Sequence, residues 1–208
     1  MTNVKWTQND FQVFQIDGLD ERMEALSTII RPKFNELGEY FTAYFSAQTG
    51  DEFFAHVAKH ARRTVNPPKD SWVAFAPYKR GYKALPHFQI GLWGSHLFIM
   101  VAIIYEAPHK REYAERLLQN EEVILKLSDD YMISGDHMAP DAISLREARE
   151  EKLTQLLTRL RDVKKGEFLI GRHISAEDAA LLSSEQFMQL AEQTFDDLVP
   201  IYNIIVGK

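Results

Sequence analysis

The chain has 208 residues, 45% hydrophobic and 26% charged, a composition typical of a globular protein that buries a core without cross-links. It has no cysteine, which excludes disulfides, thiolate metal ligands and cysteine nucleophiles. The formal net charge of −6 argues against nucleic-acid or anionic-membrane binding by the whole surface. With no signal-peptide pattern and no apolar run long enough for a bilayer, we expect one cytoplasmic domain over residues 1–208, without membrane association.

The first quarter of the chain is predicted to be mainly helical. Residues 11–16 (FQVFQI) alternate well enough for a short strand. Apolar side chains then recur at spacings of three and four over residues 19–44, which predicts an amphipathic helical segment that Gly50 ends. Pro32 interrupts it, either as a kink or as the first turn of a second helix. Residues 51–61 are predicted to form another short helix.

A β-hairpin is the clearest local signal. Adjacent prolines make residues 64–71 a loop, and residues 71–77 are predicted to be a strand. Residues 86–105 then predict a hairpin with Gly94-Ser95 in a turn of the mirror-image type. This register pairs the apolar residues of one face, Phe88 with Val101, Ile90 with Ile99 and Leu92 with Leu97. The opposite face is mixed, as expected for the wall of a pocket, and carries His87, Gln89, Gly91, Trp93, His96, Phe98, Met100 and Ala102.

The rest of the chain alternates helices with short strands. We expect a helix over residues 109–127 and strands over residues 131–134 and 168–174. Two capping boxes, Ser144-x-x-Glu147 and Ser183-x-x-Gln186, each open an amphipathic helix, the second running to about Val199 before Pro200 bends or ends it. Together these elements predict an α+β fold in which an antiparallel β-sheet with a central hairpin packs against several amphipathic helices.

Three strings of residues carry a resemblance to a known family. They are HARRTVNPPKDSWVAF (60–75), KRGYKALPHFQIGLW (79–93) and FLIGRH (168–173). Over essentially its whole length the chain resembles the YktB-like family of uncharacterised proteins. The resemblance implies an α+β fold with an antiparallel sheet packed against helices, in agreement with the elements above. It implies no activity and no catalytic residue.

Well-known catalytic motifs are missing from the sequence. It has no Gly-rich phosphate loop, no G-x-S-x-G and no H-E-x-x-H, which argues against familiar NTPase, hydrolase and zincin sites. His56 and His60 have the spacing to share a metal on a helix, but no third ligand has a matching local spacing, and we predict no metal. The sequence defines neither a cofactor nor an oligomeric state.

One segment has the opposite charge to the rest of the chain. Residues 59–83 hold seven Lys and Arg against one acid, Asp70, so this segment carries 7 − 1 = +6 and the remainder −12. These cations lie in two loops at opposite ends of strand 71–77, roughly 20 Å apart unless the chain folds back. Arginine suits bidentate capture of phosphate or carboxylate. The alternative is that the charges pair with acidic helices.

The sequence therefore predicts a basic, histidine-containing pocket for a small anionic ligand that carries phosphate or carboxylate. His87, Gln89 and Trp93 share one face of the hairpin, and His173 shares a face with Gly171, a pattern that fits a polar pocket. Whether a reaction follows, with His87 or His173 as the proton-transfer group, is left open. The candidate ligand-binding residues are His60, Arg62, Arg63, Asn66, Lys69, Arg80, His87, Gln89, Trp93, Arg172 and His173.

Two other interpretations remain open. In the first, the protein is a non-enzymatic module that presents residues 59–83 to nucleic acid or to an acidic protein, with Trp72 and Tyr82 available for stacking. The acidic remainder of the surface opposes a long polyanion, which makes nucleic acid the less favoured partner. In the second, the conspicuous residues only stabilise the fold, for example as buried histidines with backbone partners.

Overall fold

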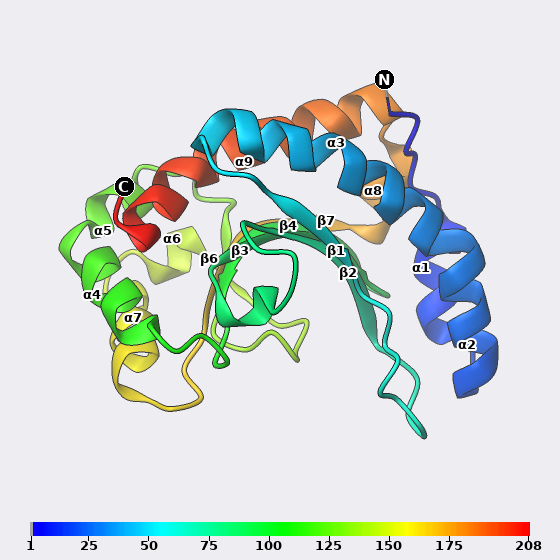
Figure 1. Ribbon diagram of the computed structural model, residues 1–208, viewed down its shortest axis with the longest axis horizontal. Helices are drawn as coiled ribbons and strands as arrows, with labels where there is room; N and C mark the ends of the chain where they lie inside the picture. Colours follow the sequence, from blue (N-terminus) through cyan, green and yellow to red (C-terminus); the bar gives the residue numbers. More distant parts are fainter. Residues whose placement is uncertain (1) are drawn as a thin grey trace.

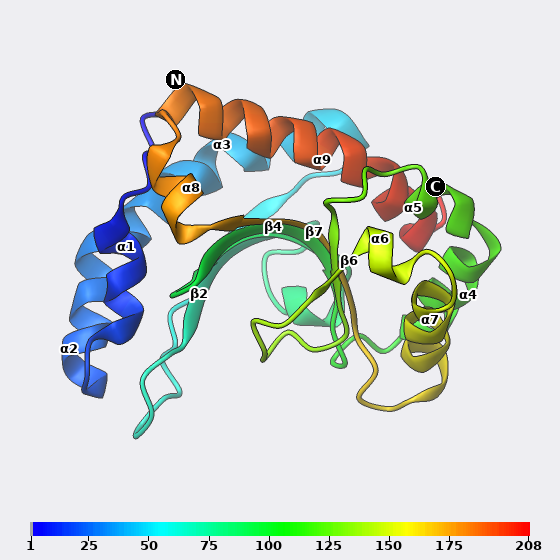
Figure 2. The same cartoon turned by 180° about the vertical axis from the view of Figure 1, so that it is seen from behind.

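The computed structural model describes residues 2–208 and confirms the predicted α+β class. A seven-stranded antiparallel sheet has the strand order β1-β2-β3-β4-β7-β5-β6. The sheet is arched, with helices over its convex face and at both ends, and loops beneath its concave face (Figures 1 and 2). No helix within residues 2–208 is both long and apolar enough to cross a bilayer.

The elements have the following bounds. The strands are β1 (Phe54–Val57), β2 (Asp70–Ala76), β3 (His87–Trp93), β4 (His96–Ile103), β5 (Met132–Ser134), β6 (Ile143–Ser144) and β7 (Phe168–Ser175). The α-helices are α1 (Gln8–Gln12), α2 (Leu19–Ala25), α3 (Arg31–Thr49), α4 (Lys110–Gln119), α5 (Glu121–Leu125), α6 (Leu145–Ala148), α7 (Lys152–Asp162), α8 (Ala176–Leu181) and α9 (Ser184–Val206).

The convex face of the sheet carries the main core. Helices α3 and α9 lie side by side across it, and the Phe45 ring of α3 stacks on Phe88 of β3 at a centroid distance of 4.2 Å (Figure 1). The hairpin has the predicted register: Phe88 opposes Val101, and the two further apolar pairs match as well. The turn type was wrong, because Gly94 does not have the positive φ that a mirror-image turn requires.

Two predicted elements have the wrong type. Residues 11–15 are helical, since a capping box between Thr7 and Asp10 starts α1 before the alternating segment begins, and a 3-10 turn over Val13–Gln15 follows α1. Residues 51–61 are not a helix but contain strand β1, which pairs with β2 at the edge of the sheet. Local periodicity is a weak guide where an unpaired sheet edge offers hydrogen bonds to the chain.

Most helix ends follow the predicted signals. Pro32 lies in the first turn of α3, after a π-helical turn at Leu26–Ile30, and Gly50 caps α3 in the left-handed conformation. Both capping boxes are present, although the first opens only the four-residue α6 and the longer α7 begins at Lys152. Pro200 does not end α9, which continues to Val206.

Candidate functional site

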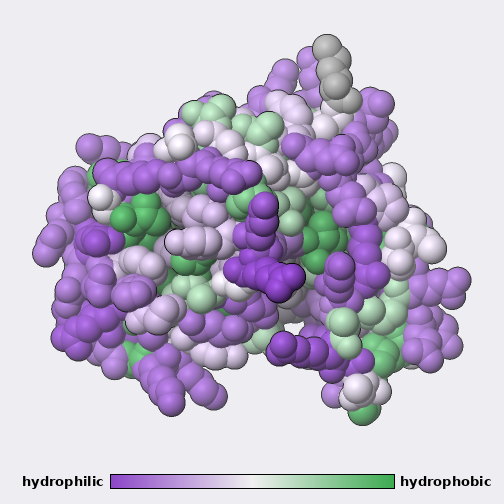
Figure 3. Space-filling view, in the orientation of Figure 1, coloured by the Kyte–Doolittle hydropathy of each residue, from purple (hydrophilic) through white to green (hydrophobic). Residues whose placement is uncertain are grey.

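The concave face of the sheet is lined by a small apolar cluster and covered by loops instead of helices. The cluster comprises Trp93, Phe98, Met100, Ala102, Ile104 and Leu169, with Trp72 packed against it. Three loops, residues 58–69, 77–86 and 135–142, lie on this side of the sheet (Figure 2). Strongly hydrophilic side chains flank an indentation there (Figure 3). This is the mixed face that the hairpin pattern predicted.

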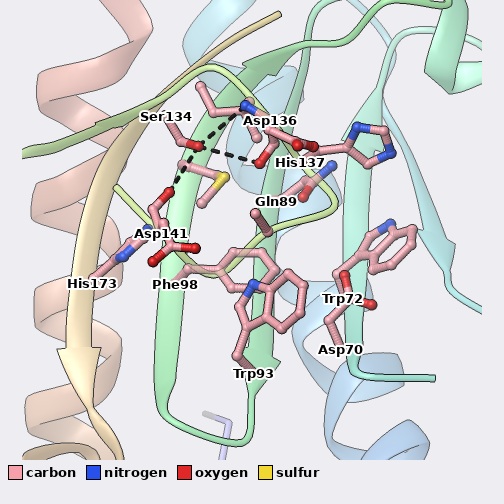
Figure 4. Close-up of a pocket in the computed structure, with 13 residues that line it drawn as sticks. Asp70, Trp72, Gln89, Trp93, Phe98, Ser134, Asp136, His137, Asp141 and His173 are labelled. Atoms are coloured by element: carbon pink, nitrogen blue, oxygen red, sulfur yellow. Dashed lines mark hydrogen bonds between the residues drawn. The ribbon is translucent and has the colours of Figure 1, made fainter. Parts of the chain in front are cut away.

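The innermost hollow, here called the inner pocket, lies between the sheet and the loop of residues 135–142 (Figure 4). Its volume is about 30 Å³, enough for a water-sized group but not for a metabolite. Its lining combines aromatic, acidic and imidazole side chains: Asp70, Trp72, Gln89, Trp93, Phe98, Met100, Ser134, Asp136, His137, Ala139, Asp141, Leu169 and His173.

Two wider hollows adjoin the inner pocket. The basic groove, of about 470 Å³, is lined by Ala58, Lys59, His60, Ala61, Arg62, Arg63, Trp72, Gly81, Tyr82, Lys83 and Glu106. The side cleft, of about 530 Å³, is lined by Arg22, Arg63, Asn66, Pro67, Lys69, Asp70, Trp93 and Met138. Arg63 lines both, Trp72 connects the groove with the inner pocket, and Asp70 connects the cleft with it.

The two basic loops meet because the chain folds back. Strand β1 returns alongside β2, so residues 58–63 lie beside residues 81–83 in the basic groove. Of the seven Lys and Arg in residues 59–83, only Lys83 forms an ion pair within the described chain, with Glu106 at 3.7 Å. The other six cations of this segment are therefore not paired with carboxylates of the acidic helices in residues 2–208.

An aromatic network holds the wall between the groove and the inner pocket. The indole Nε1 of Trp72 donates to the hydroxyl of Tyr82 at 2.9 Å. The His60 ring packs edge-on against Trp72 at 5.5 Å, and its Nε2 lies 3.2 Å from the Ser71 hydroxyl. His60 has a φ of 51°, a conformation that a residue other than glycine keeps only where its surroundings hold it.

Three predicted site residues lie away from these hollows. His87 is fully buried behind Gln89, with Nδ1 2.7 Å from the Leu85 carbonyl and Nε2 2.7 Å from the Gln89 amide. Arg172 is on the opposite face of β7, paired with Asp130 and stacked 4.5 Å from the Tyr131 ring. Arg80 is exposed in the loop after β2 and lines none of the three hollows. The other eight candidates line at least one of them.

The structure adds a histidine–carboxylate pair that sequence reasoning did not find. Glu167 is only 2% exposed, and its carboxylate accepts hydrogen bonds from the backbone and ring of His137 and from the backbone of Tyr105. Burial raises the pKa of Glu167, but the hydrogen bonds from His137 outweigh it and lower that pKa overall. With Asp136, three ligand-type atoms lie within 4.8 Å of one another, a spacing compatible with a cation. Since the Glu167 oxygens already accept N–H groups, a hydrogen-bonded pair describes the cluster better.

Asp70 is the second addition. It is the lone acid of the basic segment, and its side chain makes no ion pair within residues 2–208. Burial raises the pKa of this carboxyl to about 6, against the opposing influence of Arg63 and His137. A carboxyl group that titrates near neutral pH can exchange protons with a ligand.

Comparison with known proteins places the chain in a family. Residues 6–202 match the family described as a domain of unknown function (DUF1054). The chain belongs to the DUF1054 family. A UPF0637 protein of Lysinibacillus sphaericus is 66% identical over 208 residues, which cover 100% of this chain and 99% of that protein. UPF0637 proteins of Staphylococcus aureus and Staphylococcus haemolyticus are 48% and 46% identical over 98% and 97% of the chain, covering 100% of each relative. The resemblance to an uncharacterised family is thereby confirmed.

This DUF1054 chain also stacks two histidines face to face, one of them buried and the other half-buried. The rings of His96 and His173, on neighbouring strands, stack at 4.2 Å, and Nε2 of His96 is buried with no hydrogen-bond partner among residues 2–208. Burial lowers the pKa of His96 to about 4 and that of His173 to about 3. Neutral rings are therefore favoured in the folded state.

We expect the free energy of unfolding to fall as the pH drops from about 6.5 towards 4. In this range His96 and His173 become protonated in the unfolded chain, whereas burial keeps both rings neutral in the folded state. His60 and His87, whose pKa values burial lowers to about 4, act in the same direction, and Asp70 acts in the opposite one. Urea unfolding at pH 7 and pH 5 measures the difference in the free energy of unfolding between the two pH values. This difference should be smaller in the double variant His96→Gln/His173→Gln. The exposed His109→Gln serves as control, and an equal pH dependence in all three proteins would refute this account.

Proposed function

We propose that the protein binds a small anionic ligand on the concave side of the sheet, with the phosphate or carboxylate held by cations of the basic groove and the side cleft. The observation that carries the proposal is that the cations lining these hollows, apart from Lys83, form no ion pair within residues 2–208, with Arg63 common to both hollows. Volumes of about 470 and 530 Å³ are in the range of small-molecule sites.

The arginines are also placed for recognition of an anion. The Arg63 guanidinium donates only one hydrogen bond within the described chain, at 3.3 Å to the carbonyl of Asn66, so most of its N–H groups remain available. Arg22 anchors the loop of residues 58–69, because its Nη1 donates a hydrogen bond to the Pro68 carbonyl at 2.8 Å. A basic loop that is anchored before the ligand arrives loses less entropy on binding.

The test is ligand-induced thermal stabilisation with inorganic phosphate and with citrate. At a concentration one hundred times the Kd, binding adds about 2.7 kcal/mol to the free energy of unfolding of the wild-type protein. The double variant Arg62→Ala/Arg63→Ala should lose this stabilisation. Lys79→Ala/Arg80→Ala removes the same charge outside the hollows and should keep it.

An unchanged anion shift in Arg62→Ala/Arg63→Ala would refute the proposal. Equal loss in both double variants would show a response to overall charge instead of a site. Tight binding of a single-stranded oligonucleotide that weakens steeply with salt would favour the nucleic-acid module.

A further inference from the structure

We propose that His137, oriented by Glu167, is the general base of a phosphate-ester hydrolysis site at the inner pocket. The inference rests on the proposed anion binding, because Arg63 and Lys69 of the side cleft hold the phosphate of the ester. Nothing in the family description assigns an activity to these residues.

The hydrogen bonds of Glu167 fix the orientation and the tautomer of His137. The carboxylate lies 2.8 and 2.9 Å from Nδ1 of His137, accepts from its backbone N–H at 2.7 Å, and accepts from the backbone N–H of Tyr105 at 3.1 Å. A carboxylate only accepts, so Nδ1 carries the hydrogen, and in the neutral ring the lone pair is on Nε2. A base held by a third group in this way is the arrangement that activates hydroxyl nucleophiles in unrelated enzymes.

Nε2 belongs to a ring that lines the inner pocket. Figure 4 shows the His137 ring at the end of the pocket where the Gln89 amide and Trp72 lie. The side chain of His137 is 14% exposed, and no residue of the described chain hydrogen-bonds to its Nε2. The chain has seven histidines, and in residues 2–208 only His137 combines a buried carboxylate partner with a place on a cavity wall.

Asp70 connects the base to the cations. Asp70 lines both the inner pocket, which His137 also lines, and the side cleft, which Arg63 and Lys69 line. A phosphate at Arg63 and Lys69 therefore lies next to the entrance of the inner pocket. With a volume of about 30 Å³, the inner pocket itself accommodates the attacking water and not the ester.

The chemical step balances with these groups. The oxygen of the water attacks phosphorus while one of its protons moves to Nε2 of His137. The P–O bond to the alcohol breaks, and the departing oxygen takes a proton from the carboxyl of Asp70, which burial keeps protonated at higher pH than usual. The products are the alcohol and phosphate, and a proton returns from His137 to Asp70 through solvent.

The experiment uses EDTA-treated full-length protein with p-nitrophenyl phosphate, bis(p-nitrophenyl) phosphate and phenyl phosphate. His137→Gln should lower kcat about a hundredfold or more, with the phosphate-induced thermal shift preserved. Glu167→Gln, whose single amide oxygen can still accept one of the two backbone N–H groups, should lower kcat less and leave KM unchanged. Asp70→Asn should slow phenyl phosphate more than p-nitrophenyl phosphate, since the poorer leaving group needs the proton more.

The control is His109→Gln. His109 also has Nδ1 beside a carboxylate, Glu112 at 3.3 Å, but this pair is exposed at the start of α4, away from the inner pocket, and should not affect hydrolysis. Wild-type protein that binds phosphate but hydrolyses no ester would overturn the general base and leave the proposed function intact. No phosphate shift and no hydrolysis would overturn both. Hydrolysis that needs added Mg²⁺ or Mn²⁺ would also overturn it, by assigning Asp136, His137 and Glu167 to a cation.

Discussion

Phe45→Ala is expected to lower the free energy of unfolding by about 3–5 kcal/mol, the usual cost of deleting a fully buried phenylalanine ring. Its ring, on α3, lies 4.2 Å from Phe88, 4.8 Å from Phe195, 5.2 Å from Phe75 and 5.4 Å from Phe53. Alanine would leave a cavity where α3, α9 and the sheet meet. Rings fixed on three separate elements cannot collapse into that space without moving the backbone.

Urea denaturation monitored by far-UV circular dichroism measures this loss. Phe45→Leu, which keeps much of the volume, should cost less than Phe45→Ala. Tyr78→Ala removes an aromatic ring that is 61% exposed and should change stability by less than about 0.5 kcal/mol. Equal stabilities of Phe45→Ala and Tyr78→Ala would contradict the assignment of this core.

Gly171→Ala is expected to cost about 3 kcal/mol, because a Cβ atom has no room at this position. The added atom would lie 1.9 Å from the carbonyl oxygen of Ile99 and 2.6 Å from the Cα of Met100. Both atoms belong to β4, so the central strands β4 and β7 would have to separate. Backbone atoms cannot move aside as the end of a flexible side chain does.

The matched control for Gly171→Ala is Gly94→Ala in the hairpin turn. Gly94 has no positive φ, and its added Cβ would meet Phe14 Cβ at 3.4 Å, close to ordinary contact. We expect Gly94→Ala to cost less than about 1 kcal/mol in the same urea titration. A Gly171→Ala protein as stable as Gly94→Ala would contradict this account, because it would show that β4 and β7 can separate enough to accommodate the Cβ atom at little cost.

Local signals in the sequence were sufficient for the strand register at the sheet centre and for the starts of α6 and α9. The hairpin register follows from alternation around Gly94-Ser95, and both capping boxes lie where their residues indicate. Such features depend on neighbours a few residues away. Strand β1 was missed because its structure depends on pairing with β2, more than ten residues further along the chain.

The candidate site was predictable only in part, for the same reason. The charge of residues 59–83 marked the basic groove, but the meeting of its two loops depends on the return of β1 beside β2. His137 and Glu167 are 30 residues apart and match no motif, so only the fold reveals their pairing. Arg172 was predicted to bind the ligand although alternation on β7 puts it on the face opposite to His173, where it pairs with Asp130.

The hydrogen bonds behind Gln89 decide which kind of ligand atom can face this side chain. The Leu85 carbonyl accepts from Nδ1 of His87, so Nε2 of that ring must accept from the Gln89 NH₂ group. The orientation of the amide is thereby fixed: one N–H bonds the imidazole, and the oxygen and the second N–H are left for other partners. A hydroxyl or an amine of a bound molecule can face only the oxygen side of this amide, and an acceptor oxygen only the side of the remaining N–H. The buried imidazole thus fixes the polarity of a cavity wall that it does not itself line.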